Sequence, residues 1–216
     1  MAAKLEKKKH NLRGFVHLFL LTAIGLYVLF SILAPVLMKL GFEQSAKLIY
    51  SVYSPMCHQF AFRSWFLFGE QAHYPLADST PVDILPYEQY FRLSGVDLKY
   101  AQQLIGNSTA GFKLAICQRD IAIYSALFLF GLIFLATGKK IQKIPLVIWI
   151  ICGVLPFAVD GLTQLWKYMP FEHFLFLRRE STPLVRTITG GMFGWFTGWY
   201  IFPAIQQIID RHDANR

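Results

Sequence analysis

Residues 116–137, "ICQRDIAIYSALFLFGLIFLAT", combine a polar beginning with a long apolar run. A helix needs about 20 mostly apolar residues to cross the hydrocarbon core of a membrane, and this run is long enough. Its first turn nevertheless holds Cys117, Arg119 and Asp120. Ionisable side chains at membrane depth are costly and mark functional sites by default. The stretch therefore predicts a membrane-spanning helix with a polar site at one end.

Three other segments have similar length and apolar character, namely residues 15–38, 144–166 and 184–209. The whole chain is 55% hydrophobic and 16% charged, whereas soluble domains are about a quarter charged. The net charge of +8 does not indicate a nucleic-acid partner, because the basic residues flank apolar runs. We expect an all-α integral membrane protein with four transmembrane helices in the lipid bilayer, the last three of them within residues 114–209.

The basic segments set the expected orientation. The tail at residues 1–14 carries four lysines and an arginine, and "GKKIQK" at residues 138–143 carries three lysines and no acid. Short loops of this kind stay in the cytoplasm, so both segments are expected there, with residues 210–216 as a second cytoplasmic tail. The apolar run after the first tail exceeds the roughly 7–15 residues of a signal-peptide core, so we expect an uncleaved helix.

The segment at residues 46–69 is apolar but does not fit as a further span. An even number of crossings must separate two cytoplasmic segments, and the first two spans already supply them. We therefore expect a re-entrant or interfacial helix on the outer side, broken near Pro55. A five-span alternative would place residues 138–143 outside. Residues 70–113, with five acids and three bases, are expected to form an extracytoplasmic insertion with its own structure.

With this topology, the polar residues of four segments meet at the outer end. We predict catalytic roles for Asp160, Arg119 and Arg186, with Asp160 paired to Arg186, Arg119 or Arg63. The predicted ligand-binding residues are Gln59, Arg63, Thr163, Gln164, Arg179 and Ser181, and Glu180 lies among them. The competing interpretation is that the ion pair of Asp160 only holds helices in register.

Cys57, His58, Cys117 and Asp120 are the candidate metal ligands. Thiolate, imidazole and carboxylate all bind zinc, and Cys117 and Asp120 share a helical turn. A Cys57–Cys117 disulfide is the alternative, since the outer side of a membrane is often oxidising.

Other residues are assigned to packing. Gly190, Gly194 and Gly198 recur every four residues, a spacing that lets a neighbouring helix approach closely. Cys152 lies alone in an apolar run and is expected to act as a small hydrophobic residue.

Four blocks in order resemble a known family: "CHQFAFRSWF" at 57–66, "CQRD" at 117–120, "PFAVDGLTQ" at 156–164 and "RESTPLVRTITG" at 179–190. They are similar to a family of prokaryotic membrane proteins called domain of unknown function 2085. The resemblance implies a multi-helix protein of the prokaryotic cell membrane and no particular activity. This chain departs from the family at Asp120, where a cysteine is usual, and in residues 70–113, which look like an insertion.

Two functions remain open at this stage. The first is a metal-dependent enzyme whose arginines hold an anionic lipid headgroup, for which guanidinium groups are suited. The second is a non-enzymatic module for lipid binding, transport or assembly into a complex, in which the cysteines are structural.

Overall fold

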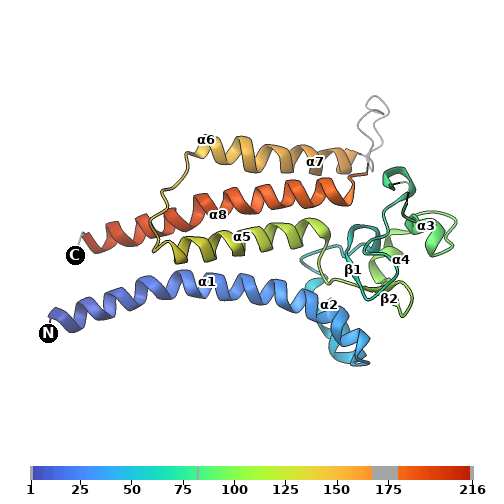
Figure 1. The fold of residues 1–216 in the computed structure, drawn as a ribbon, viewed down its shortest axis with the longest axis horizontal. Helices are drawn as coiled ribbons and strands as arrows, with labels where there is room; N and C mark the ends of the chain where they lie inside the picture. The colour runs from blue at the N-terminus through green and yellow to red at the C-terminus, as the bar shows by residue number, and fades with distance from the viewer. Residues whose placement is uncertain (1, 82, 167–179, 215–216) are drawn as a thin grey trace.

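The computed structural model describes residues 2–81, 83–166 and 180–214, and these are mostly helical. Four long helical stretches lie side by side (Figure 1): α1 (Ala2–Lys39), α5 (Gln118–Ala136), the continuous run of α6 (Leu146–Ile148), η3 (Trp149–Val154) and α7 (Leu155–Trp166), and α8 (Pro183–Ala214). The beginning of α1 and the end of α8 lie at one end of this bundle, and a small unit of short elements lies at the other.

Three of these stretches are long and apolar enough to cross a membrane: Phe15–Lys39, Gln118–Ala136 and Leu146–Gln164. Each coincides with a predicted span. The fourth predicted span, residues 184–209, is helical within α8, but α8 is not one of the three candidate spans among the described residues. Glycine, threonine and glutamine residues interrupt its apolar sequence and lower its hydropathy.

The predicted packing role of the glycines in α8 is confirmed. A β-carbon on Gly190 would lie 2.7 Å from the carbonyl oxygen of Arg119, and one on Gly194 would overlap the carbonyl oxygen of Ile123. Arg119 and Ile123 lie in the first two turns of α5. Because the glycines have no side chain there, the backbones of α5 and α8 approach closely along this line.

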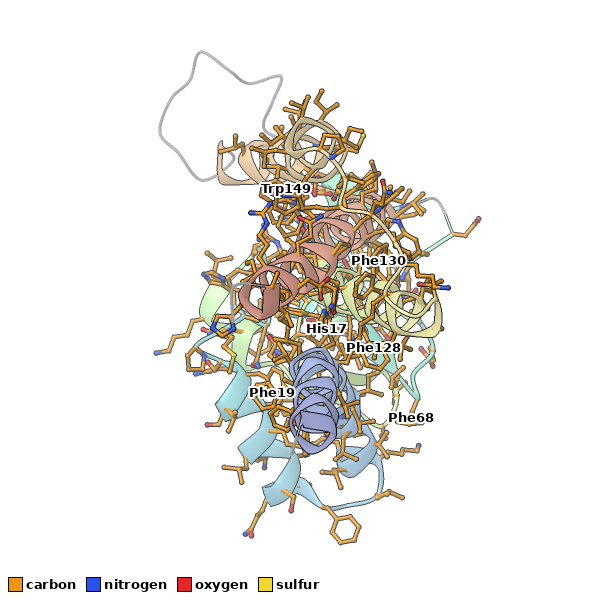
Figure 2. The ribbon with its side chains drawn as sticks, turned by 90° about the vertical axis from the view of Figure 1, so that its left-hand side faces the viewer. His17, Phe19, Phe68, Phe128, Phe130 and Trp149 are labelled. Carbon is orange, nitrogen blue, oxygen red and sulfur yellow. The ribbon has the colours of Figure 1, made fainter. Side chains whose placement is uncertain are left out.

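Viewed end-on, the bundle has a polar residue inside and apolar residues outside (Figure 2). His17 is fully buried, and its ring lies 5.5 Å from that of Phe134 and 6.1 Å from that of Phe202. Phe19, on the outer side of α1, is 61% exposed. Large exposed apolar side chains such as Leu129 and Ile151 continue this surface on other helices. Such a surface suits contact with lipid rather than with water.

The segment at residues 46–69 differs from the expected single helix. Gly41, with φ +84°, ends α1, and the N–H groups of Gly41 and Phe42 return to the carbonyl oxygens of Met38 and Leu37. Helix α2 (Glu43–Tyr53) follows and ends two residues before Pro55, near the predicted break. The remainder is irregular, apart from η1 (Ala61–Arg63) and β1 (Phe66–Leu67).

Residues 57–113 form most of the small unit at the end of the bundle. Its sheet is antiparallel, with β3 (Gly111–Lys113) between β1 and β2 (Gly106–Asn107), and Phe66 opposite Lys113. The unit also contains η2 (Ala77–Ser79), α3 (Tyr87–Tyr90) and α4 (Leu98–Gln103). An aromatic core of Phe62, Phe66, Tyr74 and Tyr87 lies inside it. The all-α prediction missed this sheet, because strands of two or three residues are too short to show an alternating pattern.

Candidate functional site

The loop after α2 that carries Cys57 and His58 is fixed by buried side chains. Gln59 has a left-handed φ of +53°, and its Nε2 donates to the carbonyl oxygens of Tyr50 at 2.9 Å and Ala115 at 2.8 Å. The Nζ of Lys113, on β3, donates to the carbonyl oxygen of Gln59 at 2.6 Å. Both amide donors of Gln59 are thus used on the backbone, so this residue anchors the loop.

Cys57 and Cys117 lie together where this loop meets the beginning of α5. The backbone N–H of Cys117 donates to Cys57 Sγ at 3.3 Å, and Cys117 is the residue immediately before α5. Both thiols are free. A separate hydrogen bond between the two thiol side chains, together with burial, raises the pKa of Cys57, and the same thiol–thiol bond lowers the pKa of Cys117. Of the two thiols, Cys117 therefore loses its proton more readily, and the thiolate is the form that binds metals.

Asp120, in the first turn of α5, completes a group of three potential metal ligands. One ligand atom from each of Cys57, Cys117 and Asp120 lies within 4.8 Å of the others. Two thiolates and a carboxylate are a donor set that zinc accepts. His58, the fourth predicted ligand, is not part of this group; its side chain is exposed and its ring lies 5.4 Å from that of Phe60.

Glu180 lies between two arginines and ties the small unit to α8. Its carboxylate accepts hydrogen bonds from Arg63 Nε at 2.8 Å and Arg63 Nη2 at 3.1 Å. It also pairs with Arg186 Nη2, which donates in addition to Gln164 Oε1 at 3.2 Å. Glu180 and Arg186 are only 1% and 2% exposed. Their burial is tolerated because the opposite charges are in direct contact.

Asp160 joins α5, α7 and α8 in a second ion pair. Its Oδ2 pairs with Arg119 and accepts hydrogen bonds from Gln164 Nε2 at 3.2 Å and Thr189 Oγ1 at 3.3 Å. The sequence left Arg186, Arg119 and Arg63 as possible partners of Asp160, and in the structure the partner is Arg119. Thr163 donates to the backbone carbonyl oxygen of Asp160 at 2.9 Å. The Arg119 guanidinium also lies 5.4 Å from the centre of the Phe157 ring.

Most of the predicted site residues surround one cavity of about 240 Å³, namely Cys57, His58, Gln59, Arg63, Cys117, Arg119, Asp120, Gln164 and Arg186. Asp160, Thr163 and Ser181 instead line a separate cavity of about 540 Å³ between α7 and the beginning of α8. Arg179 lies outside the described residues. The sequence predicted that these side chains share one end of the bundle, and the described ones line two cavities at the end near the small unit.

Two buried residues near the site escaped the sequence argument. Thr189 lies in the "RTITG" block but looked like an ordinary helix residue. Lys113 looked like a surface lysine of the insertion, yet it is fully buried and burial lowers its pKa from 10.5 to about 7. A lysine that lies between apolar residues in a short strand gives no sequence pattern that distinguishes a buried lysine from an exposed one.

Comparisons with known proteins agree with the membrane fold. Residues 107–200 match the model of a family described as "Predicted membrane protein (DUF2085)". An uncharacterized protein, MJ1492, of Methanocaldococcus jannaschii is 29% identical over 163 residues, which cover 74% of this chain and 70% of the relative. No solved structure matches the chain.

The matched region contains the second, third and fourth sequence blocks, and the block beginning at Cys57 precedes it. It also contains the ion pair between Arg119 and Asp160. The resemblance seen in the sequence is thereby confirmed: residues 107–200 of this chain are similar to the DUF2085 family of predicted membrane proteins.

Proposed function

We propose that the protein is a zinc-dependent membrane enzyme that acts on an anionic lipid headgroup. The observation that carries this proposal is the grouping of Cys57, Cys117 and Asp120 beside a cavity lined by arginines. A catalytic zinc site uses three protein ligands and leaves one position open, and three ligands are what this group offers. When bound, the ion would activate a water molecule or polarise an oxygen of the substrate.

The arginines of the cavity would bind the headgroup. Arg119 and Arg186 each keep a buried Nε–H that has no hydrogen-bond partner among the described residues. Both residues line the same cavity as the three ligands. Guanidinium N–H groups bind phosphate and carboxylate oxygens well, so an anion in this cavity would accept hydrogen bonds that the protein leaves unused.

Asp160 supports this site in a different way from the one expected. Its Oδ2 is occupied by Arg119 and by two further donors, and Asp160 lines the separate cavity. We therefore assign it a positioning role that holds Arg119 in place. The catalytic role that the sequence predicted for Asp160 loses support, because a general base must be free to accept the proton of the reacting group.

We further infer four crossings, with the site on the outer face of the prokaryotic cell membrane and the N-terminus in the cytoplasm. Helix α8 has 32 residues and lies along α5 and α7, so it is long enough to cross at 1.5 Å per residue. Lys140 and Arg211 lie in the loop and the helix end that share one side of the bundle with the start of α1. Positively charged loops favour the cytoplasmic side.

The metal content of the detergent-purified protein tests this function. We expect about one zinc ion per chain, lost in Cys57→Ser and Cys117→Ser and weakened in Asp120→Asn. The matched control is Cys152→Ser in η3, which should keep its zinc. A wild-type protein that contains no zinc and in which Cys57 and Cys117 both react as free thiols would contradict the proposal.

The non-enzymatic alternative has an observation in its favour. The described arginines of the site, Arg63, Arg119 and Arg186, are all paired with Glu180 or Asp160. Such pairs can hold helices in register without any ligand. If the protein contained a Cys57–Cys117 disulfide and no zinc, the cysteines would be structural and a lipid-binding or transport module would be favoured.

A further inference from the structure

A larger cavity, of about 620 Å³, adjoins the cavity of the three ligands. The two share His58, Phe60, Arg63, Arg119, Phe157 and Gln164. The remaining lining of the larger cavity is apolar or lacks a side chain, and it comprises Leu98, Ala158, Gly161 and Leu162. The polar groups of the larger cavity therefore lie in the part that it shares with the smaller cavity, and Phe157 and the unshared residues form its apolar side.

The apolar side belongs to a helix that is suited to the membrane. Phe157, Ala158 and Leu162 lie within the candidate span Leu146–Gln164, and Leu162 is 53% exposed. Leu98, from α4 of the small unit, closes the other side. This cavity therefore lies where the span meets the small unit, which is where a bilayer would end.

Gly161 leaves room inside this cavity. Among the described residues, a β-carbon placed on it would meet only one atom within 4 Å, Arg119 Nη1, at 3.6 Å. A larger side chain at this position would extend over the guanidinium group and fill the space in front of it. The sequence block "VDGLTQ" thus combines the partner of Arg119, Asp160, with a residue that keeps Arg119 accessible.

The polar side offers donors to an oxyanion. Arg119 has a buried Nε–H without a partner among the residues that the structure describes, and its side chain is 16% exposed. Arg63 is 20% exposed beside it. Two guanidinium groups that line one cavity are suited to phosphate, which has several acceptor oxygens.

We propose that the larger cavity admits a lipid phosphate sideways from the bilayer, with the phosphate at Arg63 and Arg119 and the hydrocarbon chain along Phe157 and Leu162. The inference rests on the proposed function, because it names the substrate class of that site. A hydrocarbon chain next to an exposed apolar helix face stays in contact with lipid, whereas a soluble phosphate has no apolar group that could contact this face.

Native mass spectrometry of the full-length protein in detergent tests this inference. The probes are dioleoyl phosphatidic acid and dioleoylglycerol, which differ in the phosphate alone. We expect the wild type to retain the phosphatidic acid at least about tenfold better. Gly161→Leu should lower that retention by at least about tenfold. The control is Gly191→Leu in α8, where a β-carbon would meet no atom of the described residues within 4 Å and which lines neither cavity.

Three outcomes would overturn lateral entry of a lipid phosphate. These are equal retention of the two lipids, equal behaviour of the two glycine variants, and displacement of the phosphatidic acid by equimolar inorganic phosphate. Zinc measured in the same samples separates this inference from the proposed function. Zinc with no retained lipid contradicts only the inference, whereas retained lipid with no zinc contradicts only the metal-dependent activity.

Discussion

The charged side chains of the site are buried in contact with one another, and that contact is what permits their burial. Glu180 is shared by Arg63 and Arg186, and Asp160 is held by Arg119. Removing one partner of such a group leaves an uncompensated charge, which costs more than the pair itself contributes. Loss of Glu180 would leave two guanidinium groups without their carboxylate.

Glu180→Gln is therefore expected to lower the free energy of unfolding by roughly 3–5 kcal/mol. Glutamine keeps the size of the side chain but removes its charge. The control is Glu43→Gln, which breaks a surface pair with Lys47 and should stay within about 0.5 kcal/mol of the wild type. Thermal unfolding in detergent, followed by circular dichroism, measures both. Similar melting temperatures for the two variants would show that Glu180 is not an essential counter-ion.

Lys113 gives the stability of the small unit a dependence on pH. Burial lowers the pKa of this lysine from 10.5 to about 7 in the folded protein. Between these values the unfolded chain binds the proton and the folded protein does not, so raising the pH favours the folded state. The contribution is at most about 1.4 kcal/mol per pH unit.

Comparison of the wild type with Lys113→Met isolates this effect. As the pH rises from 7 to about 9, the wild type should gain stability relative to the variant, because only the wild type must release a proton on folding and that release costs less at higher pH. Lys99→Met, at an exposed position of α4, should follow the wild type. The measurement is the unfolding free energy at several pH values, and parallel curves for wild type and Lys113→Met would contradict the assignment.

At the scale of elements, the sequence predicted what depends on composition and missed what depends on contacts. Three spans followed from apolar length alone and agree with the structure. Residues 46–69 looked equally apolar, but the helix stops at Tyr53 and the rest is held by long-range hydrogen bonds such as that from Lys113 to Gln59. This bond joins residues that are 54 positions apart in the sequence, so no local pattern reveals it.

The contact between α5 and α8 should depend on Gly194. A β-carbon there would overlap the carbonyl oxygen of Ile123, so the two helices must separate to accept alanine. We expect Gly194→Ala to lower the unfolding free energy by roughly 1–3 kcal/mol. Gly191→Ala, on the same helix, places a β-carbon with no neighbour within 4 Å in the part of the chain that the structure describes, and should be neutral or raise the unfolding free energy by up to about 1 kcal/mol. Equal melting temperatures in detergent would show that the close approach is unimportant.

At the scale of the whole molecule, the polar site and the basic segments lie at opposite ends of one bundle (Figure 1). The loop between α5 and α6, which carries Lys140, and the end of α8 lie at the end of the chain termini, whereas the start of α5, next to Cys117 and Asp120, lies toward the small unit. This separation follows from the bundle alone, without any assumption about the membrane. The orientation in the membrane therefore depends on one fact, namely which end of the bundle lies in the cytoplasm. If the end with the basic segments lies there, the site lies on the other side.

Cysteine labelling in intact cells answers that question. A membrane-impermeant maleimide should label Ser108→Cys, which is exposed in the loop between β2 and β3, because the small unit is expected outside. Lys140→Cys and Arg211→Cys should be labelled only after the cells are permeabilised. The parent protein, which retains its native cysteines, gives the background. Labelling of Lys140→Cys but not of Ser108→Cys in intact cells would invert the orientation. Labelling of both Arg211→Cys and Ser108→Cys in intact cells would place the end of α8 outside. Either α8 or the helical run α6–α7 would then not cross the membrane, which would contradict four crossings.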